Sequence, residues 1–599
     1  MSNRMNTSTT GKSKPKDSKK TLVRLLSYLT KSKGLLIIVI ITSIVSTLAA
    51  LYGSYAISPM IKIIGSAVSK DITVTVMSQL LGKQLFILAL VFLLEIVTMY
   101  FSGKLMVKIS QNTVMNIRKE MYSHTLRTKI QSHDINTHGD LMSRFTNDID
   151  LVSEGLNTAA ASIVINIFTL LGTVVVMAIL SPFLTVVSLI ILPLLSLMSN
   201  FIVKKSRYYS KKQQQSLGDL NGYIEEAMEG QAIMQVFNHE DDAVDIFRKK
   251  NKTFRKNTQW AQITSIMIFP LMQNMNTINY AIIGMVGGYL AINGRLSIGD
   301  LGAYVNLTRT QGRPINEISS QFTILQSALA SAERIFELLD WDLESVNDTD
   351  IIMENVEGDV RFENVVFGYN KNTIVLNDVT FWAKPGQKIA FVGATGAGKT
   401  TITNLITRFY DINSGRILID NNEIKDINRF SLRKHISMVL QDTHLFTGTI
   451  MDNIRYGNLE ATDEQCIEAA KLANAHYFIR TLEHGYNTRI SGTGSELSQG
   501  QKQLLNIARA AVANPSILIL DEATSSIDTR TERLIERGMD SLMSGRTTFV
   551  IAHRLSTVRN ADAIIVLDKG EIIERGSHDD LLELNGRYAS LYNGQTQLD

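Results

Sequence analysis

The first half of this 599-residue chain contains apolar runs long enough to cross a lipid bilayer, and the second half does not. Residues 34–56 (GLLIIVIITSIVSTLAALYGSYA) and 164–180 (VINIFTLLGTVVVMAIL) are two such runs. A helix of about 20 apolar residues spans the hydrocarbon core of a bilayer. A chain of this length is also too long for one ordinary core. The sequence therefore predicts a membrane-embedded half followed by a separate soluble half.

Six segments of the first half are candidate membrane spans. They are Leu35–Ile57, Leu85–Phe101, Ile163–Leu180, Phe183–Val203, Ile263–Ala291 and Ile298–Phe322. The last two are less regular, because Pro270 interrupts one of them and Arg309 and Arg313 lie inside the other. The first run is too long for a secretory signal, so we expect it to be retained. An even number of spans returns the chain to the side of the membrane on which it begins.

The charge distribution indicates which side that is. Basic residues cluster in residues 11–20 (GKSKPKDSKK) and 203–212 (VKKSRYYSKK), and basic flanks tend to remain cytoplasmic. We therefore expect a multi-pass protein of the cell (inner) membrane with both termini in the cytoplasm. The formal net charge is only +3, which predicts no nucleic-acid partner. The single cysteine, Cys466, can form neither an internal disulfide nor a metal cluster.

Composition and patterning divide the chain into four parts. We expect a basic cytoplasmic tail (1–20), a six-helix transmembrane domain (21–340), a linker (341–358) and a soluble domain (359–599). In the soluble part, short apolar runs such as 388–392 (KIAFV) and 517–520 (ILIL) alternate with helical segments. Such runs, bounded by turns, are typical of a buried and mainly parallel sheet. The predicted fold is an α-helical transmembrane domain followed by an α/β domain.

A glycine-rich loop follows one of these strands and precedes a helix. Residues 393–401 (GATGAGKTT) fit the pattern G-x-x-x-x-G-K-[ST], in which glycines let backbone N–H groups turn toward phosphate oxygens. Lys399 can then reach the outer phosphates and Thr400 can offer a hydroxyl to Mg²⁺. The expected nucleotide-binding residues are Gly393, Ala394, Thr395, Gly396, Ala397, Gly398, Lys399, Thr400 and Thr401. The soluble domain is therefore predicted to be a P-loop nucleotide-binding domain with ATP and Mg²⁺ as cofactors.

Two consecutive acids supply the second part of such a site. Residues 516–522 (SILILDE) form a buried strand that delivers Asp521 to its carboxyl end, where Mg²⁺ is expected. Glu522 follows directly and can orient or deprotonate an attacking water. An apolar run that ends in two acids is a weak signal alone. Together with the phosphate loop it predicts ATP hydrolysis.

At this point the sequence resembles the ATP-binding cassette (ABC) family, and specifically its exporter-type half-transporters. The family's motifs occur in order: Tyr369 matches the aromatic that stacks on adenine, and Gln441 matches the residue that contacts Mg²⁺. His553 matches the switch histidine that holds the γ-phosphate, and residues 525–528 (SSID) match the loop after the acidic pair. The signature motif LSGGQ appears as LSQGQ, so the expected ATP contacts there are Ser498, Gln499, Gly500 and Gln501.

The resemblance extends into the membrane half. Residues 139–150 (GDLMSRFTNDID) and 229–240 (EGQAIMQVFNHE) look like the two cytoplasmic loops of exporters, and 331–340 (SAERIFELLD) looks like the end of the last membrane helix. In the family these loops contain short coupling helices that dock on the ATPase domains, the second on the partner chain. Two ATPase domains close head to tail around two ATPs. The resemblance therefore implies a second half-transporter chain as partner and an inactive monomer.

Two departures from the family pattern bear on that partner. Gln499 stands where the signature usually has glycine, and Gly492 stands where a glutamate is usual just ahead of it. Glu522 is intact. In heterodimeric exporters an intact glutamate often occurs on the chain whose own signature is altered. The sequence favours a heterodimer, and a homodimer in which Gln499 is a tolerated variant stays open.

The cargo is predicted only as amphipathic or lipid-like, as in multidrug efflux. Glu95 lies within the second span, where a carboxylate either faces a cavity or forms an interhelical hydrogen bond. Methionines of the fifth span suit adaptable packing as well as apolar ligands. An importer built on the exporter architecture, with siderophore-like cargo, and a non-transporting ATP-regulated membrane protein are the alternatives. The long apolar spans exclude a soluble cassette ATPase.

Overall fold

The computed structural model describes residues 17–594 apart from 70–71, 345–349, 371–372, 441–442, 493, 522–528 and 552–557. The side chains of residues 159–161, 191–201, 268–269, 271–273, 275–276, 316 and 529 are also outside the description. The chain divides into two compact units. Met1–Leu126 and His138–Asp340 form the helical unit, and Arg127–Thr137 and Trp341–Asp599 form the α/β unit.

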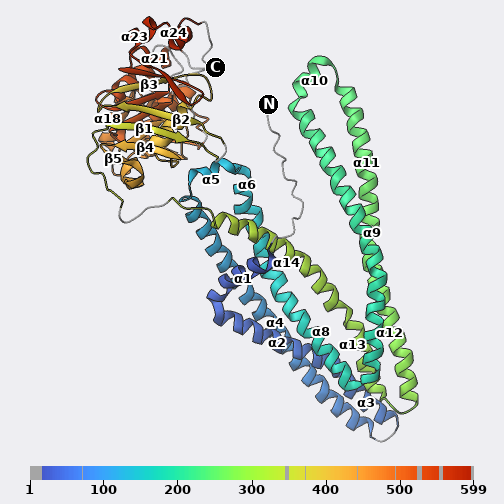
Figure 1. Cartoon of the computed structure of the whole chain (residues 1–599). Helices are drawn as coiled ribbons and strands as arrows, with labels where there is room; N and C mark the ends of the chain where they lie inside the picture. The colour runs from blue at the N-terminus through green and yellow to red at the C-terminus, as the bar shows by residue number, and fades with distance from the viewer. Residues whose placement is uncertain are drawn as a thin grey trace. The chain divides into compact units, whose positions relative to one another are not determined.

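The helical unit consists of long helices with short connections (Figure 1). Its helices are α1 (Ser18–Leu29), α2 (Lys33–Tyr55), α3 (Ile57–Val68), α4 (Val74–Thr125), α6 (His138–Ser143), α7 (Ile149–Glu154), α8 (Ala160–Leu180), α9 (Pro182–Glu229), α10 (Gln231–Phe237), α11 (Glu240–Ile266), α12 (Ile268–Ile292), α13 (Ile298–Thr310) and α14 (Gly312–Leu339). Among the described residues, Ser18–Val68, Val74–Thr125 and His138–Leu180 are long and apolar enough to cross a membrane. The count of six spans stays a prediction.

Prolines explain where three of these helical rods are interrupted. Proline has no N–H, so the carbonyl four residues earlier loses its helical partner. Pro59, Pro270 and Pro314 lie four residues after Tyr55, Ile266 and Thr310. Those three residues are the last of α2, α11 and α13, and in each case a new helix begins two residues later. The interruption expected at Pro270 therefore occurs, the sixth predicted span is divided in the same way, and the first predicted span ends at such a break.

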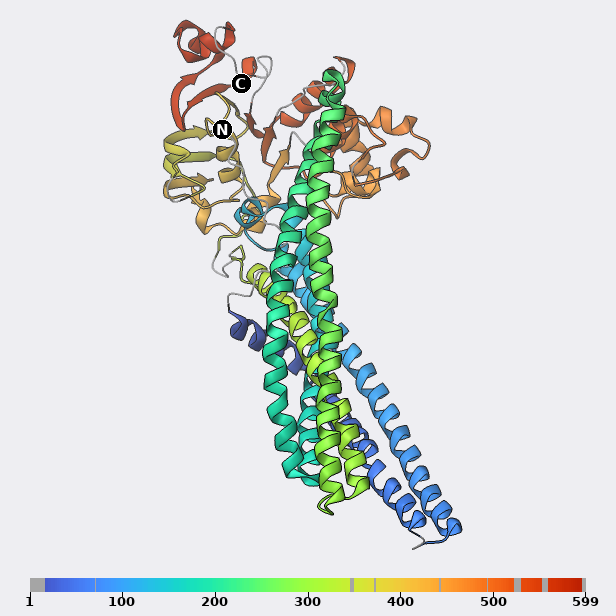
Figure 2. The same ribbon diagram turned by 90° about the vertical axis from the view of Figure 1, so that its right-hand side faces the viewer.

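The helices α9 and α11 form a long antiparallel hairpin. They lie side by side in both views, with α10 at the tip (Figures 1 and 2). The tip is apolar and exposed, because Ile233, Val236 and Phe237 keep 65%, 75% and 66% of their surface accessible. These residues belong to the second of the two cytoplasmic loops expected from the sequence, residues 229–240.

The α/β unit contains a four-stranded sheet, order β2-β1-β4-β5, and a six-stranded sheet, order β12-β11-β3-β10-β9-β6. Its strands are β1 (Val360–Phe367), β2 (Leu376–Ala383), β3 (Lys388–Val392), β4 (Ser414–Ile419), β5 (Asn422–Glu423), β6 (Ile436–Val439), β7 (Gly448–Thr449), β8 (Arg489–Ile490), β9 (Ile517–Asp521), β10 (Thr547–Ile551), β11 (Ala563–Asp568) and β12 (Glu571–Gly576). Its helices are α5 (Ile130–Ile135), α15 (Lys399–Ile406), α16 (Arg429–Lys434), α17 (Ile450–Arg455), α18 (Asp463–Leu472), α19 (His476–Thr481), α20 (Gln499–Val512), α21 (Thr529–Met543), α23 (His578–Glu583) and α24 (Arg587–Tyr592).

The six-stranded sheet brings the ends of several strands to one edge. Strands β11, β3, β10, β9 and β6 pair in parallel, and β10 is in register with both neighbours through Ile551↔Phe391 and Ile551↔Asp521. The strand residues of β10 are all buried, as is typical of a parallel sheet covered on both faces. Because parallel strands end at the same edge, the carboxyl ends of β3, β6, β9 and β10 lie along one edge of the sheet.

The short helix α5 belongs to the α/β unit although it lies between helices of the other unit in the sequence. Ile130 packs against the hydrophobic core that includes the four-stranded sheet. Asp134 accepts a hydrogen bond from the hydroxyl of Tyr410, and Gln131 donates one to the carbonyl of Tyr369 at 3.3 Å. Residues 127–137 are therefore held by the α/β unit through both apolar and polar contacts.

Candidate nucleotide-binding site

The loop between β3 and α15 has a backbone that only glycine can form at two positions. Gly398 has φ +106°, and a Cβ there would lie 2.5 Å from Cδ2 of Leu376. A Cβ on Gly393 would lie 2.2 Å from the carbonyl oxygen of Leu567. Side chains therefore fit neither position, which is the reason that glycine stands at both. This is the strand–loop–helix context that the sequence motif requires.

Lys399 is the first residue of α15 and is folded back onto this loop. Its Nζ donates hydrogen bonds to the carbonyls of Gly393 (2.6 Å) and Ala394 (3.1 Å), and the residue is only 6% exposed. Burial lowers the pKa of Lys399, and the negative charge of Asp521 opposes that shift. The ammonium group is therefore positioned in the loop and poorly solvated, so an incoming phosphate would stabilise its charge.

Tyr369 lies next to the same helix. Its hydroxyl is 3.1 Å from Oγ1 of Thr401, and its ring packs edge-on against Phe367 and Tyr410. The ring is thus fixed beside the phosphate loop, at a place that suits an adenine base. Sequence reasoning proposed that stacking role, and it stays a proposal.

The residues expected at Mg²⁺ fit that ion chemically. Thr400 is exposed on the first turn of α15, and Asp521 is the last residue of β9. Hydroxyl and carboxylate oxygens are ligands that Mg²⁺ prefers, and it is commonly held by one or two side chains together with nucleotide phosphates. Among the described residues no group of three or more His, Cys, Asp or Glu side chains could hold a metal by itself.

The signature residues begin helix α20. Ser498 is its N-cap, and a reciprocal pair of hydrogen bonds joins Ser498 and Gln501 as a capping box. Gln499 is the first helical residue and is exposed, whereas Gly500 is buried. Gln499 is not among the residues with positive φ, so the helix accepts glutamine there without backbone strain. Gly492, the other departure from the family pattern, is exposed in the preceding turn.

Three expected functional residues lie outside the described residues. They are Gln441, Glu522 and His553, and residues 525–528 are outside it as well. The strands that precede them are described, and β6, β9 and β10 run parallel and in register. The catalytic and metal roles of these three residues therefore remain proposals.

Two stretches that the sequence assigned to cytoplasmic ends meet within the helical unit. Asp148 is 1% exposed and accepts hydrogen bonds from Ser331 (2.9 Å) and from Arg334. Arg144 donates to the carbonyl of Arg334 at 2.9 Å. Residues 139–150 and 331–340 are therefore joined by an ion pair between a buried aspartate and a partly exposed arginine. Glu95 lies on α4 and is partly exposed, and its role stays a prediction.

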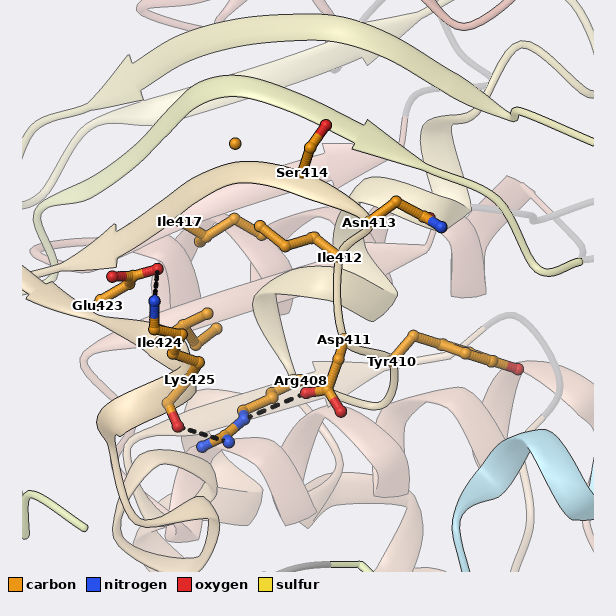
Figure 3. A pocket seen from close by; sticks show the side chains of 11 residues that line it. Arg408, Tyr410, Asp411, Ile412, Asn413, Ser414, Ile417, Glu423, Ile424 and Lys425 are labelled. Atoms are coloured by element: carbon orange, nitrogen blue, oxygen red, sulfur yellow. Dashed lines mark hydrogen bonds and ion pairs between the residues drawn. The ribbon is translucent and has the colours of Figure 1, made fainter. Parts of the chain in front are cut away.

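Sequence reasoning missed a group of charged residues in the α/β unit. Arg429 and Arg433 of α16 contact Glu344, a residue of the linker. These residues lie far apart in the sequence, so no local pattern marks them. A separate cavity of about 380 Å³ lies near this group (Figure 3). It is lined by Arg408, Tyr410, Asp411, Ile412, Asn413, Ser414, Gly415, Ile417, Glu423, Ile424 and Lys425.

A helical unit with membrane-length helices, joined in one chain to an α/β unit with a phosphate loop, defines an ATP-driven membrane transporter. Comparison with known proteins agrees: residues 36–313 match the family model of the ABC transporter transmembrane region, and residues 376–525 match the family model described as ABC transporter. The chain belongs to the ABC transporter family. It is an ATP-hydrolysing half-transporter of the exporter type, a membrane protein that works as a dimer.

Several relatives match most of the chain. An uncharacterised ABC transporter ATP-binding protein of Bacillus subtilis, YfiC, is 43% identical over 585 residues, 98% of this chain and 96% of the relative. A fatty acid ABC transporter ATP-binding/permease protein of Mycobacterium bovis is 40% identical over 80% of this chain and 76% of its own length. A relative named for multidrug export, YgaD of Bacillus subtilis, is 35% identical over 81% of this chain and 84% of its own length.

Proposed function

We propose that the chain exports amphipathic or lipid-like compounds across the cell membrane, as one half of a heterodimeric ABC exporter. The observation that carries this proposal is the formed phosphate loop, with Lys399 already inside it, in a chain whose helical unit has membrane-length helices. Relatives named for fatty acid transport and for multidrug export support this substrate class. Both termini would lie in the cytoplasm.

The residues of the α/β unit have distinct roles in this proposal. Tyr369 stacks on adenine, residues 393–401 hold the phosphates, and Thr400, Gln441 and Asp521 hold Mg²⁺. Glu522 orients or deprotonates the attacking water, and His553 contacts the γ-phosphate. The residues Ser498, Gln499, Gly500 and Gln501 face the nucleotide of the partner chain, because α20 begins there and its N–H groups attract a phosphate.

Export can be tested in inside-out membrane vesicles that contain the complete transporter. We expect ATP-dependent uptake of a fluorescent long-chain fatty acid, because the cytoplasmic face of such vesicles is outside. The matched variant is Glu522→Gln, which should retain ATP binding and lose at least about 100-fold of the uptake and hydrolysis rates, in line with the loss of a general base. ATP-driven release of preloaded fatty acid would instead indicate import. Normal hydrolysis by Glu522→Gln would contradict the role of Glu522.

A further inference from the structure

Two segments that follow helices of the helical unit pair with each other in the α/β unit. Residues 127–129 follow α4, and residues 342–344 follow α14. Thr128 and Leu343 form an antiparallel bridge. The N–H of Lys129 donates to the carbonyl of Asp342 (3.2 Å), and the N–H of Glu344 donates to the carbonyl of Arg127 (2.9 Å). The chain segments that follow α4 and α14 are thus joined by backbone hydrogen bonds.

The side chain of Glu344 links these paired segments, residues 127–129 and 342–344, to α16. Its two carboxylate oxygens accept hydrogen bonds from Nη1 and Nη2 of Arg433, each at 2.8 Å. Nη1 of Arg429 lies 3.5 Å from the same carboxylate. The Glu344 side chain is 18% exposed and that of Arg429 only 3%. A two-point contact of this kind fixes orientation as well as distance.

The same two arginines hold the far end of the phosphate-loop helix. Arg433 donates from Nε to the carbonyl of Thr407 (3.2 Å) and from Nη2 to the carbonyl of Arg408 (3.0 Å). Arg429 donates to the carbonyl of Arg408 at 3.3 Å. Thr407 is the C-cap of α15, the helix that begins with Lys399. Cationic side chains bound at a helix C-terminus also interact favourably with the helix dipole.

These contacts form a short and continuous path. Helix α15 has 8 residues and is therefore about 12 Å long. At its start lies the phosphate loop, and at its end lie the carbonyls bound by Arg433 and Arg429. The carboxylate of Glu344 is the next contact, and its backbone leads to both chain segments that continue into α4 and α14. A shift of α15 would therefore move Glu344 through charge-assisted hydrogen bonds.

The electrostatics of the group favour a charged Glu344. Burial acts to raise the pKa of its carboxyl group, but the hydrogen bonds and charge of Arg433, together with the charge of Arg429, outweigh burial and lower it. The remaining carboxylate, Asp411, contacts Arg429 through both oxygens at 3.1 and 3.2 Å. Neutralising Glu344 would leave Arg433 without the carboxylate that its fork binds.

We propose that Glu344 is a positioning residue that passes the state of the phosphate loop to membrane helices α4 and α14 through Arg433. The inference rests on the assignment of residues 393–401 as the phosphate loop. It goes beyond that assignment, because it places part of the coupling between ATP and the membrane helices in a linker carboxylate. Glu344 itself contacts neither nucleotide nor transported compound in this proposal.

The test compares Glu344→Gln with its parent in the purified dimer in lipid nanodiscs. Spin labels at Lys83→Cys on α4 and Tyr289→Cys on α12, both exposed positions, report the distance between these helices. Cys466, the only native cysteine, is buried. With Mg²⁺, ATP and orthovanadate, we expect Glu344→Gln to trap nucleotide within about twofold of the parent. The fraction of molecules whose spin-label distance changes on trapping should fall about tenfold, which lies within the usual range of coupling between two sites.

Further variants separate coupling from mere support of the fold. Glu354→Gln alters an exposed glutamate of the same linker and should behave like the parent. Arg433→Gln and the double variant should lose the distance change to the same extent as Glu344→Gln, because all three break one pair. A full distance change in Glu344→Gln would overturn the proposal. The proposal would also be overturned if Glu344→Gln lost nucleotide trapping and thermal stability together. The same holds if the spin-label distance in the parent did not change on trapping.

A failure of the phosphate-loop assignment would look different. In that case the parent would trap no nucleotide, or Lys399→Ala would bind ATP as tightly as the parent. Neither result depends on which compound is transported, so the test also stands apart from the proposed substrate class.

Discussion

At the scale of single residues, the environment of Lys399 links nucleotide binding to a proton. Burial lowers the pKa of Lys399 and the charge of Asp521 opposes the shift. The lysine therefore loses its proton at a lower pH than an exposed lysine would. Phosphate oxygens favour the ammonium form, so bound ATP should raise the pKa again. ATP affinity should then be unaffected near neutral pH and should fall as the pH rises through the pKa of Lys399.

This linkage predicts proton uptake on ATP binding at alkaline pH only. Calorimetry in two buffers of different ionisation enthalpy would measure it, at about pH 8 and about pH 10. We expect the parent to take up protons at the higher pH and Lys399→Ala not to do so. The ATP affinity of Lys399→Ala should also be at least about tenfold weaker than that of the parent at both pH values. Equal proton uptake by Lys399→Ala and its parent would show that the lysine does not titrate with binding.

The residue scale also shows what a sequence can and cannot predict. Residues 393–401 are contiguous and fit one motif, so this part of the site could be predicted, although the atoms that exclude a Cβ at Gly393 and Gly398 belong to the distant Leu567 and Leu376. Glu344 and Arg433 lie 89 residues apart. Neither has an unusual local context, and only the folded chain brings them into contact. The departure at Gln499 could be seen in the sequence, but its strain-free place at the start of α20 could not.

At the scale of elements, the positions of three helix breaks could be predicted from the prolines. The polar contacts around the break between α13 and α14 could not. Gln311 separates α13 from α14 and is 2% exposed. Oγ of Ser188 lies 3.5 Å from Oε1 of Gln311, and Nδ2 of Asn279 lies 3.4 Å from Oγ of Ser188. Oδ1 of Asn279 and Nε2 of Gln311 have no partner among the described residues. Exchanging the oxygen and nitrogen positions of both side-chain amides still leaves one NH₂ group and one carbonyl oxygen without a partner. The reason is that the Ser188 hydroxyl has only one hydrogen to donate.

This imbalance predicts an unusual order of stabilities. Ser188→Ala should lower the free energy of unfolding by about 1–3 kcal/mol, because both amides then lose their hydroxyl partner. The triple variant Ser188→Ala, Asn279→Leu and Gln311→Leu should be as stable as the parent or more stable, since it removes the whole buried polar group. Thermal unfolding in nanodiscs would measure both. A triple variant less stable than Ser188→Ala would show that the three side chains have partners in the membrane.

At the scale of the whole molecule, two exposed features of the chain bear on how it pairs with a second chain. The tip of the α9–α11 hairpin leaves Ile233, Val236 and Phe237 exposed, and the family resemblance assigns this loop to the ATPase domain of the second chain. Gln499 is exposed at the start of α20, where the partner's ATP is expected. A glutamine side chain there occupies space that a glycine leaves open for phosphate.

We therefore predict little ATP hydrolysis from this chain purified alone in lipid nanodiscs. Addition of the product of a neighbouring transporter gene should restore it, and Gln499→Gly should raise the activity of the chain alone by about tenfold if the side chain blocks one phosphate contact. The measurement is vanadate-sensitive hydrolysis, with oligomeric mass determined on the same sample. Robust hydrolysis from a particle of two identical chains would establish a homodimer and make Gln499 a harmless variant.

Residues 127–137 belong to the α/β unit, so they can reach their native contacts only after the later part of the chain has been synthesised. This segment leaves the ribosome long before Tyr369 and Tyr410, the residues that it contacts. Native contact of this segment with residues made so much later closes a long loop, and loop closure of this kind slows folding. Until the sequence of the ATPase domain has been translated, α5 lacks its native contacts with Tyr369 and Tyr410. Chains that stop early would therefore leave Ile130 without the hydrophobic core against which it packs.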